Sequence, residues 1–446
     1  MKGNAMYRET DSLILYSSLP DDSILMRLSG IWADWEAKKD SPASLIHRTY
    51  AEVKRILDIS TSYGFDHNLW QCYLTFVMIS HENSFSLTCE RRGPRDGTIN
   101  LIAKHDFDVF LRLLHFDFRP FEESLGISCF SLLTNYKAIP KRQQLFNRHV
   151  SEPVCALAEK LNAAVSADEI FDLVTDHFNR CGVGLFGLNG AFRLHEHGDA
   201  VEIISINNMD TVQLSDLIGY DTQKAEVRAN VEAFLAGRPF NNMLLYGDAG
   251  TGKSTTVKAL LNEYWKDGLR IIELYKHQFS RLSEVISIVK NRQYRFMIFI
   301  DDLSFEENEV EYKYLKAVIE GGLESRPDNV MICATSNRRH LIRETWNDRD
   351  DMEHNGDVHR SDTMQEKLSL AARFGCAVSY SMPGHRLFQE IVKGIAKRYP
   401  ELQMSEEELL LEANRYEIRH GGESGRCAQQ FINQLVGRLK PRGSVS

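Results

Sequence analysis

The sequence contains no apolar run long enough to span a membrane. Its densest apolar stretch in the first half, residues 69–79, is far shorter than the roughly 20 residues that a transmembrane helix needs. Near the N-terminus a short apolar run, residues 13–16, ends at Ser and Pro, which is too little for a signal peptide. We therefore expect a cytoplasmic protein with no membrane partner.

Paired cysteines and strong positive charge are also missing. The 8 cysteines form no Cys-x-x-Cys pair, so neither a disulfide framework nor a zinc site is indicated. The net charge of −9 provides no bulk field that would attract nucleic acid, although a local basic patch still could. Basic segments at residues 91–95 and 338–340 leave DNA open as a partner, but solvated loops also contain such residues.

The hydrophobic periodicity divides the 446 residues into parts. Residues 1–190 show mainly helical spacing and predict a mostly helical N-terminal domain, and residues 191–210 predict a linker hairpin. Residues 211–382 alternate short apolar runs with amphipathic segments, which predicts an α/β domain with a parallel sheet flanked by helices. Residues 383–446 predict a helical lid. The candidate strands of the α/β domain are residues 243–246, 270–274, 296–300, 330–334 and 376–380.

A glycine-rich loop after the first candidate strand is suited to bind a polyphosphate. Its residues are Gly247, Asp248, Ala249, Gly250, Thr251, Gly252, Lys253 and Ser254, followed by Thr255. Glycines leave backbone N–H groups accessible to an anion, and the N-terminus of the following helix adds favourable potential. Lys253 is placed to reach the β- and γ-phosphates and Ser254 to ligate Mg²⁺. The sequence therefore predicts ATP and Mg²⁺ as ligands, against the alternative of a simple glycine-rich turn.

An acidic pair follows the candidate strand at residues 296–300. Mg²⁺ needs a second protein anchor, and a carboxylate at the end of a neighbouring buried strand supplies it, which favours Asp301. Asp302 is then placed to polarise the attacking water, with Glu306 or Glu307 as alternative bases. The competing interpretation is an acidic pair that merely caps a turn.

Three further polar residues extend this hypothesis. Asn337, or Thr335, follows a sheet strand and would orient the water or touch the γ-phosphate, unless the segment is only a turn. Arg373 precedes the last candidate strand and would act as a cation supplied to an adjacent protomer. Arg426 begins the last lid helix and would close over the nucleotide of its own chain. Taken alone, an arginine such as Arg373 is more often structural, and Arg426 is equally compatible with a surface role.

Together these motifs resemble the AAA+ ATPases, and within them a bacterial group of ATP-binding proteins. The resemblance covers roughly the second half of the chain, through residues 217–221, 247–254, 301–306, 335–340, 373–375 and 421–426. It implies an AAA+ P-loop core with a helical lid, in which Ile218, Gly219 and Tyr220 lie against adenine. It also implies that Asn337 is the sensor-1 residue, Arg373 the trans-acting arginine finger and Arg426 the sensor-2 arginine.

One position departs from the common pattern, because many AAA+ members carry Glu where this chain has Asp302. Helicase loaders and initiators also carry two aspartates there. We expect an ATPase (ATP hydrolase) that works at the subunit interface of a homo-oligomer and remodels or loads a protein or DNA partner held by residues 1–190. The alternative is an ATP-dependent switch or scaffold with little turnover. A small-molecule kinase is disfavoured, since it would not need Arg373 and a lid that carries Arg426.

Overall fold

The structure is a computed structural model that describes residues 5–138, 148–198, 200–206, 209–305, 309, 311–320, 327–337, 341 and 370–439. The chain forms two compact units. The first comprises Met1–Gly190 and Ser205–Met209, and the second comprises Ala191–Ile204 and Asp210–Ser446. Within the described ranges, no helix combines the length and the apolar character that crossing a membrane requires.

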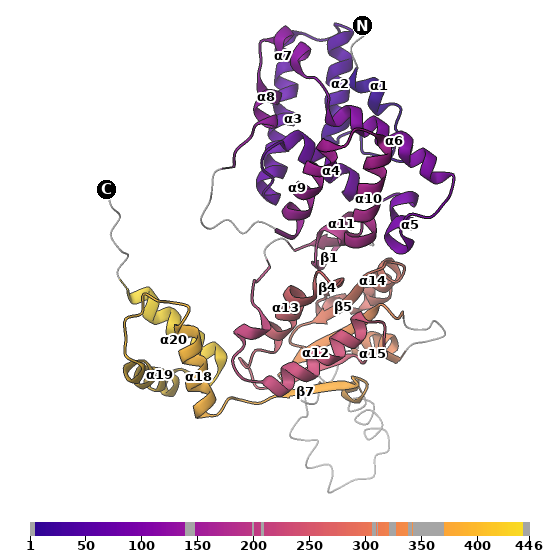
Figure 1. The fold of residues 1–446 in the computed structure, drawn as a ribbon. Helices are drawn as coiled ribbons and strands as arrows, with labels where there is room; N and C mark the ends of the chain where they lie inside the picture. Colours follow the sequence, from indigo (N-terminus) through magenta and orange to yellow (C-terminus); the bar gives the residue numbers. More distant parts are fainter. Residues whose placement is uncertain are drawn as a thin grey trace. The chain divides into compact units, whose positions relative to one another are not determined.

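The first unit is built from helices, as the sequence predicts (Figure 1). They are α1 (Met6–Thr10), α2 (Ile24–Glu36), α3 (Pro42–Tyr63), α4 (Leu69–Ser80), α5 (Ser84–Arg92), α6 (Ile99–Leu114), α7 (Arg119–Leu125), α8 (Cys129–Thr134), α9 (Arg148–Ala163), α10 (Ala167–Cys181) and α11 (Gly184–Leu188). Helix α4 is the apolar stretch noted above, and 10 of its 12 residues are buried. It is therefore the central helix of the core, packed by α3, α6, α8 and α9.

A buried carboxylate organises the start of this unit. Asp106, on α6, is fully buried and accepts hydrogen bonds from the backbone N–H groups of Ile14, Leu15 and Tyr16, at 3.0, 2.7 and 3.3 Å. These donors lie in the segment after α1, which has no helical partners for them. The side chain thus accepts hydrogen bonds from three consecutive N–H groups, including that of the buried Tyr16, and fixes the segment against α6.

We predict that Asp106→Ala destabilises the helical unit by about 3 kcal/mol or more, because it leaves buried N–H groups without an acceptor. Asp108→Ala on the same helix is the matched control, since Asp108 is half exposed and pairs with Arg112 at the surface. That control should change the free energy of unfolding by less than about 0.5 kcal/mol. Urea unfolding of the whole chain, followed by hydrogen exchange in α6, measures both. Equal effects of the two variants would contradict the assigned role of Asp106.

The second unit contains a sheet of 7 strands in the order β2-β1-β4-β5-β6-β3-β7. The strands are β1 (Ala191–His197), β2 (Ala200–Ser205), β3 (Met243–Gly247), β4 (Leu269–Glu273), β5 (Arg295–Ile300), β6 (Val330–Ser336) and β7 (Cys376–Tyr380). All neighbours from β1 to β7 pair in parallel. The five strands predicted in the α/β domain are confirmed. This order places the carboxyl ends of β5, β6 and β3 next to one another, and open α/β sheets bind ligands beside these strand ends.

The hairpin expected between the domains, β1 and β2, forms one side of the sheet, with β2 as the edge strand. β1 pairs with β4, with Ala191 opposite Ile271 and Phe192 opposite Ile272. Phe192 and Leu194 are buried, so this strand contributes to the core of the α/β unit. The sequence shows two strand-like runs and a turn, but not the long-range pairing with β4.

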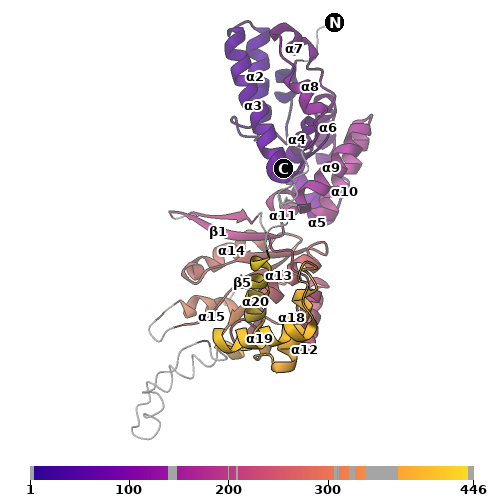
Figure 2. The ribbon, with the colours of Figure 1, turned by 90° about the vertical axis from the view of Figure 1, so that its left-hand side faces the viewer.

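Helices α12 (Asp221–Leu235), α13 (Lys253–Tyr264), α14 (Leu282–Val289) and α15 (Tyr312–Glu320) lie around the sheet. After β7 the lid follows as α18 (His385–Ala396), α19 (Glu406–His420) and α20 (Gly425–Arg438), which group together in both views (Figures 1 and 2). The lid has its own apolar core, with Phe388, Val392, Ala428 and Ile432 fully buried. A capping box formed by Ser405 and Glu408 starts α19.

Candidate functional site

The glycine-rich loop connects β3 to α13 and depends on backbone conformations that favour glycine. Gly247, Gly250 and Gly252 have φ angles of 131°, 76° and 94°. At Gly247 a Cβ atom would lie 2.1 Å from the carbonyl oxygen of Tyr380, so space as well as conformation excludes other residues. Gly252 is the N-cap of α13. The loop therefore delivers Lys253 and Ser254 to the first turn of a helix, where N–H groups without intrahelical partners attract anions.

Lys253 is almost fully buried at the centre of this loop. Its Nζ donates hydrogen bonds to the carbonyl oxygens of Gly247 and Asp248, at 2.9 and 2.6 Å, and to Oδ1 of Asn337, at 3.0 Å. Burial lowers the pKa of the Lys253 ammonium, while the negative charges of Asp248, Asp302 and Asp301 act in the opposite direction. The nearby carboxylates thus favour the charged form of an ammonium group that can bind phosphate oxygens.

Ser254 and Asp301 bring oxygen ligands together from two different elements. Ser254 Oγ, on α13, donates to Asp301 Oδ1, which follows β5, at 2.6 Å. The buried Thr335, near the end of β6, also donates its hydroxyl to Asp301 Oδ1. A hydroxyl and a carboxylate are the hard oxygen donors that Mg²⁺ prefers, and the ion keeps most of its other ligands as water or phosphate. The residues present therefore fit a magnesium ion.

Asp302 lies beside this pair in an unusual backbone conformation. Its φ of 52° falls in the left-handed region, and its N–H donates to Thr335 Oγ1 at 2.9 Å. Its Oδ1 accepts a hydrogen bond of 2.8 Å from Nδ2 of Asn337. Since Asn337 also binds Lys253, one amide side chain links the phosphate-loop cation to this carboxylate. The left-handed turn directs the two consecutive aspartates to different partners.

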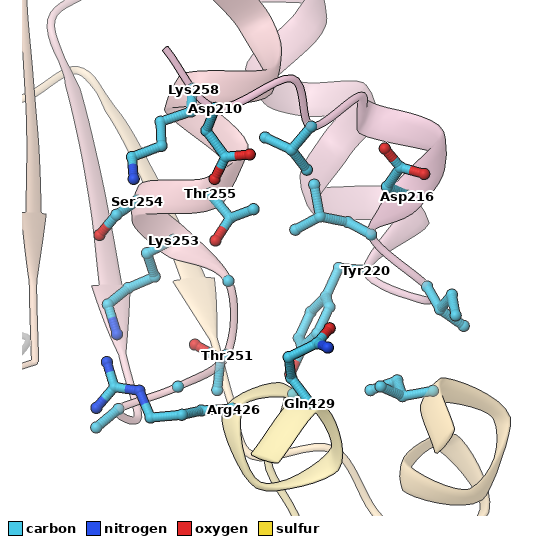
Figure 3. A pocket seen from close by; sticks show the side chains of 18 of the residues that line it. Asp210, Asp216, Tyr220, Thr251, Lys253, Ser254, Thr255, Lys258, Arg426 and Gln429 are labelled. Atoms are coloured by element: carbon cyan, nitrogen blue, oxygen red, sulfur yellow. The ribbon is translucent and has the colours of Figure 1, made fainter. Parts of the chain in front are cut away.

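These residues surround a cavity of about 920 Å³, which lies within the range of small-molecule and cofactor pockets. In Figure 3, Lys253, Ser254 and Thr255 lie along one side and Tyr220 and Asp216 along the other, while Arg426 and Gln429 enter from α20. Of the predicted site residues, those that line it are Ile218, Tyr220, Ala249, Gly250, Thr251, Gly252, Lys253, Ser254, Thr255, Asp301, Asp302, Asn337, its alternative Thr335, and Arg426.

The side of the cavity away from the phosphate loop is largely apolar. Ile218 and Tyr220 line it together with Ile391 and Ile395 of the lid helix α18. Tyr220 Oη donates to the carbonyl oxygen of Ser381 at 2.9 Å, and burial raises the pKa of Tyr220 to about 12. Such a surface suits a flat aromatic base better than a phosphate.

Several residues that the sequence analysis assigns to the site are not among those that line the cavity. Gly219 packs against Leu387 of the lid, and Gly247 and Asp248 lie in the loop without lining the cavity. Arg373, partly buried in the turn before β7, does not line the cavity of its own chain. Glu306, Glu307 and residues 338–340 lie outside the described residues.

The structure also shows polar residues that the sequence reasoning did not identify. Lys258 and Asp210 line the cavity beside the start of α13, and Arg398 pairs with Asp216 at 3.0 Å near its apolar side. Arg398 and Asp216 are 182 residues apart, so no local pattern could reveal the pair. Lys258 follows the phosphate loop by one helical turn, and only that spacing could have pointed to it.

The geometry agrees with the comparisons to known proteins. Residues 188–439, more than half of the chain, match the family described as "Protein of unknown function (DUF815)". The chain belongs to this family. With its strand order, phosphate loop and helical lid, it is an AAA+ P-loop protein.

Two curated relatives are similar over short segments, and both are Replication factor C large subunits. The protein of Staphylothermus marinus is 33% identical over 88 residues, which is 20% of this chain and 20% of that protein. That of Thermococcus kodakarensis is 45% identical over 64 residues, or 14% of this chain and 12% of that protein. The chain thus spans a fifth or less of the length of these relatives.

Among solved structures, the RuvB Holliday junction branch migration motor of Thermotoga maritima matches with 17% identity and a TM-score of 0.36. The match covers 51% of this chain and 65% of that chain. A mutant form of the same motor matches with 18% identity and a TM-score of 0.36, over 51% of this chain and 66% of that chain.

We predict that Gly247→Ala abolishes nucleotide binding, because its Cβ would collide with the Tyr380 carbonyl oxygen that the loop passes. Gly268→Ala is the matched control, since Gly268 also has a positive φ, 94°, but open space around it. The control should lose about 1 kcal/mol of stability and still bind ATP with Mg²⁺. Titration calorimetry on folded protein, checked by circular dichroism, measures the difference. Equal binding by the two variants would contradict this account of the loop.

Proposed function

We propose that this AAA+ protein binds ATP with Mg²⁺ and hydrolyses it. The observation that carries the proposal is the contact of Ser254 with Asp301 at 2.6 Å, beside the buried ammonium of Lys253. It joins the phosphate loop to the carboxyl end of the neighbouring strands, as Mg²⁺-dependent phosphoryl transfer requires. The apolar end of the cavity, with Ile218 and Tyr220, supports an adenine base.

Each residue then has a defined task. Lys253 and the loop N–H groups bind the β- and γ-phosphates, while Ser254 and Asp301 hold Mg²⁺, which neutralises charge on the phosphate oxygens when bound. Asp302 accepts the proton of the attacking water, and Asn337 holds the Asp302 carboxylate in place through the 2.8 Å hydrogen bond. Glu306 is the alternative base.

We further propose that the active unit is a homo-oligomer. Arg373 lies outside the cavity of its own chain, which fits a cation offered to the site of a neighbouring protomer. In the proposed division, residues 211–382 bind the nucleotide, residues 383–446 form the lid and residues 1–190 hold a protein or DNA partner in the cytoplasm. The similarity to Replication factor C large subunits favours work within an assembly.

A second candidate is an ATP-dependent switch or scaffold with little turnover. The identity of Asp302 favours it, because its side chain is one methylene shorter than the Glu that many AAA+ proteins carry at this position. In this case the nucleotide would order an assembly through the lid, and hydrolysis would be incidental. Light scattering and phosphate release, measured together with and without ATP, separate the two functions. ATP-driven assembly without turnover, even with a partner present, would favour the switch.

We predict that Asp302→Asn retains ATP binding and lowers turnover by roughly 10²- to 10⁴-fold, the usual contribution of a general base. Asn keeps the size of the side chain and its acceptor for Asn337 but cannot take a proton. Calorimetry measures binding and phosphate release measures turnover. Undiminished turnover would remove Asp302 from the chemistry and leave Glu306 as the candidate base.

We predict that Arg373→Ala lowers turnover by roughly 10³-fold, because the transferring phosphoryl group loses the cation that the neighbouring protomer supplies. Mixing it with Asp302→Asn should restore phosphate release, since the second variant supplies Arg373 to intact sites. Mixing it with the Arg373→Ala, Asp302→Asn double variant should not. Arg386→Ala is the surface control, because Arg386 is 95% exposed on α18. No rescue in the first mixture would contradict a shared site.

A further inference from the structure

An acidic side chain in a phosphate-binding loop needs a physical reason. Asp248 lies between Gly247 and the residues that line the cavity, and its charge, together with those of Asp302 and Asp301, opposes the lowering of the Lys253 pKa by burial. A carboxylate near a bound triphosphate repels it. The charge of Asp248 therefore opposes anion binding. A second task of the side chain would explain why an aspartate lies here.

The contacts of Asp248 are directed to the end of β7 and to the segment that leads from it into the lid. Its Oδ2 accepts a hydrogen bond from the backbone N–H of Met382 at 2.6 Å, a short charge-assisted bond across 134 residues of sequence. Its own N–H donates to the carbonyl oxygen of Tyr380 at 3.0 Å. Met382 belongs to residues 381–384, which connect β7 to α18 and are called the connector below. Asp248 thus binds the connector with its side chain and the end of β7 with its backbone.

The phosphate loop also contacts the lid at a second point. The N–H of Arg426, in the first turn of α20, donates to the carbonyl oxygen of Gly250 at 3.3 Å. The Cβ atom that Gly250 lacks would lie 3.1 Å from Cβ of Arg426. The loop therefore contacts the connector that leads into the lid and also the first turn of the last lid helix. These contacts together fix the backbone of Arg426 beside the phosphate loop, from where its side chain lines the cavity.

We propose that Asp248 is a positioning residue, whose carboxylate fastens the connector to the phosphate loop and so holds Arg426 at the phosphate end of the cavity. The proposal rests on the proposed function, since it assumes that this cavity receives a nucleoside triphosphate. A change in the loop when phosphate binds then reaches the lid through the Met382 N–H. The benefit of this fastening offsets the repulsion that Asp248 adds.

Two substitutions separate the hydrogen bond from the charge. Asp248→Asn keeps an acceptor oxygen but removes the charge, whereas Asp248→Ala removes both. Gln223→Ala is the matched control, because Gln223 Nε2 donates to the carbonyl oxygen of Ser379, one residue before the contact partner Tyr380. The full-length chain is studied by hydrogen exchange in peptides that overlap Met382, without nucleotide. Calorimetry with a non-hydrolysable ATP analogue and Mg²⁺ gives the affinity.

Asp248→Ala should speed exchange of the Met382 amide by roughly 10-fold or more and weaken analogue binding by about 10-fold, although it removes a repulsive charge. Asp248→Asn and Gln223→Ala should leave exchange within about 3-fold of the parent, and Asp248→Asn should bind the analogue at least as tightly. Unchanged exchange in Asp248→Ala, with tighter binding, would overturn the proposal and assign Asp248 a purely electrostatic effect. Exchange is measured without nucleotide, so a failure of ATP hydrolysis in the parent protein would not alter this result.

Discussion

The site depends on one close backbone contact, the passage of Gly247 beneath the carbonyl group of Tyr380. Because no Cβ intervenes, β3 and β7 stay paired up to the last residue of β3, where Gly247 lies opposite Tyr380. The chain then turns with Asp248 N–H bound to the same carbonyl oxygen. This turn allows the Lys253 side chain to fold back onto the loop carbonyls. A sheet contact thus sets the position of the phosphate-binding cation.

The strand order explains why residues from distant segments meet. β6 lies between β5 and β3, so the residues that follow these strands lie close together at the carboxyl ends of the strands. Thr335, near the end of β6, consequently reaches both the Asp301 carboxylate and the Asp302 N–H. Its hydroxyl contacts both residues of the acidic pair, while the Asp301 carboxylate also binds Ser254 and that of Asp302 binds Asn337. Parallel pairing supplies this arrangement without any long loop.

The phosphate loop was predictable because its motif consists of consecutive residues, in which the spacing of the glycines and one lysine determines the local structure. The five α/β strands were predictable for the same reason, since buried parallel strands read as short apolar runs. The pairing of β1 with β4 and the bond from Met382 to Asp248 were not. They depend on contacts far apart in the sequence, and so does the left-handed turn at Asp302, which Thr335 supports.

Asn337 connects nucleotide binding with the chemistry of the proposed reaction. Its amide oxygen accepts a hydrogen bond from Lys253 and its amide nitrogen donates one to Asp302, so one planar group contacts both side chains. Lys253 has three donors, and all three recorded acceptors are protein oxygens. Phosphate oxygens that bind Lys253 must compete with these acceptors. Any shift of Asn337 that follows also moves the donor that orients Asp302, which couples the loading of the site to the position of its base.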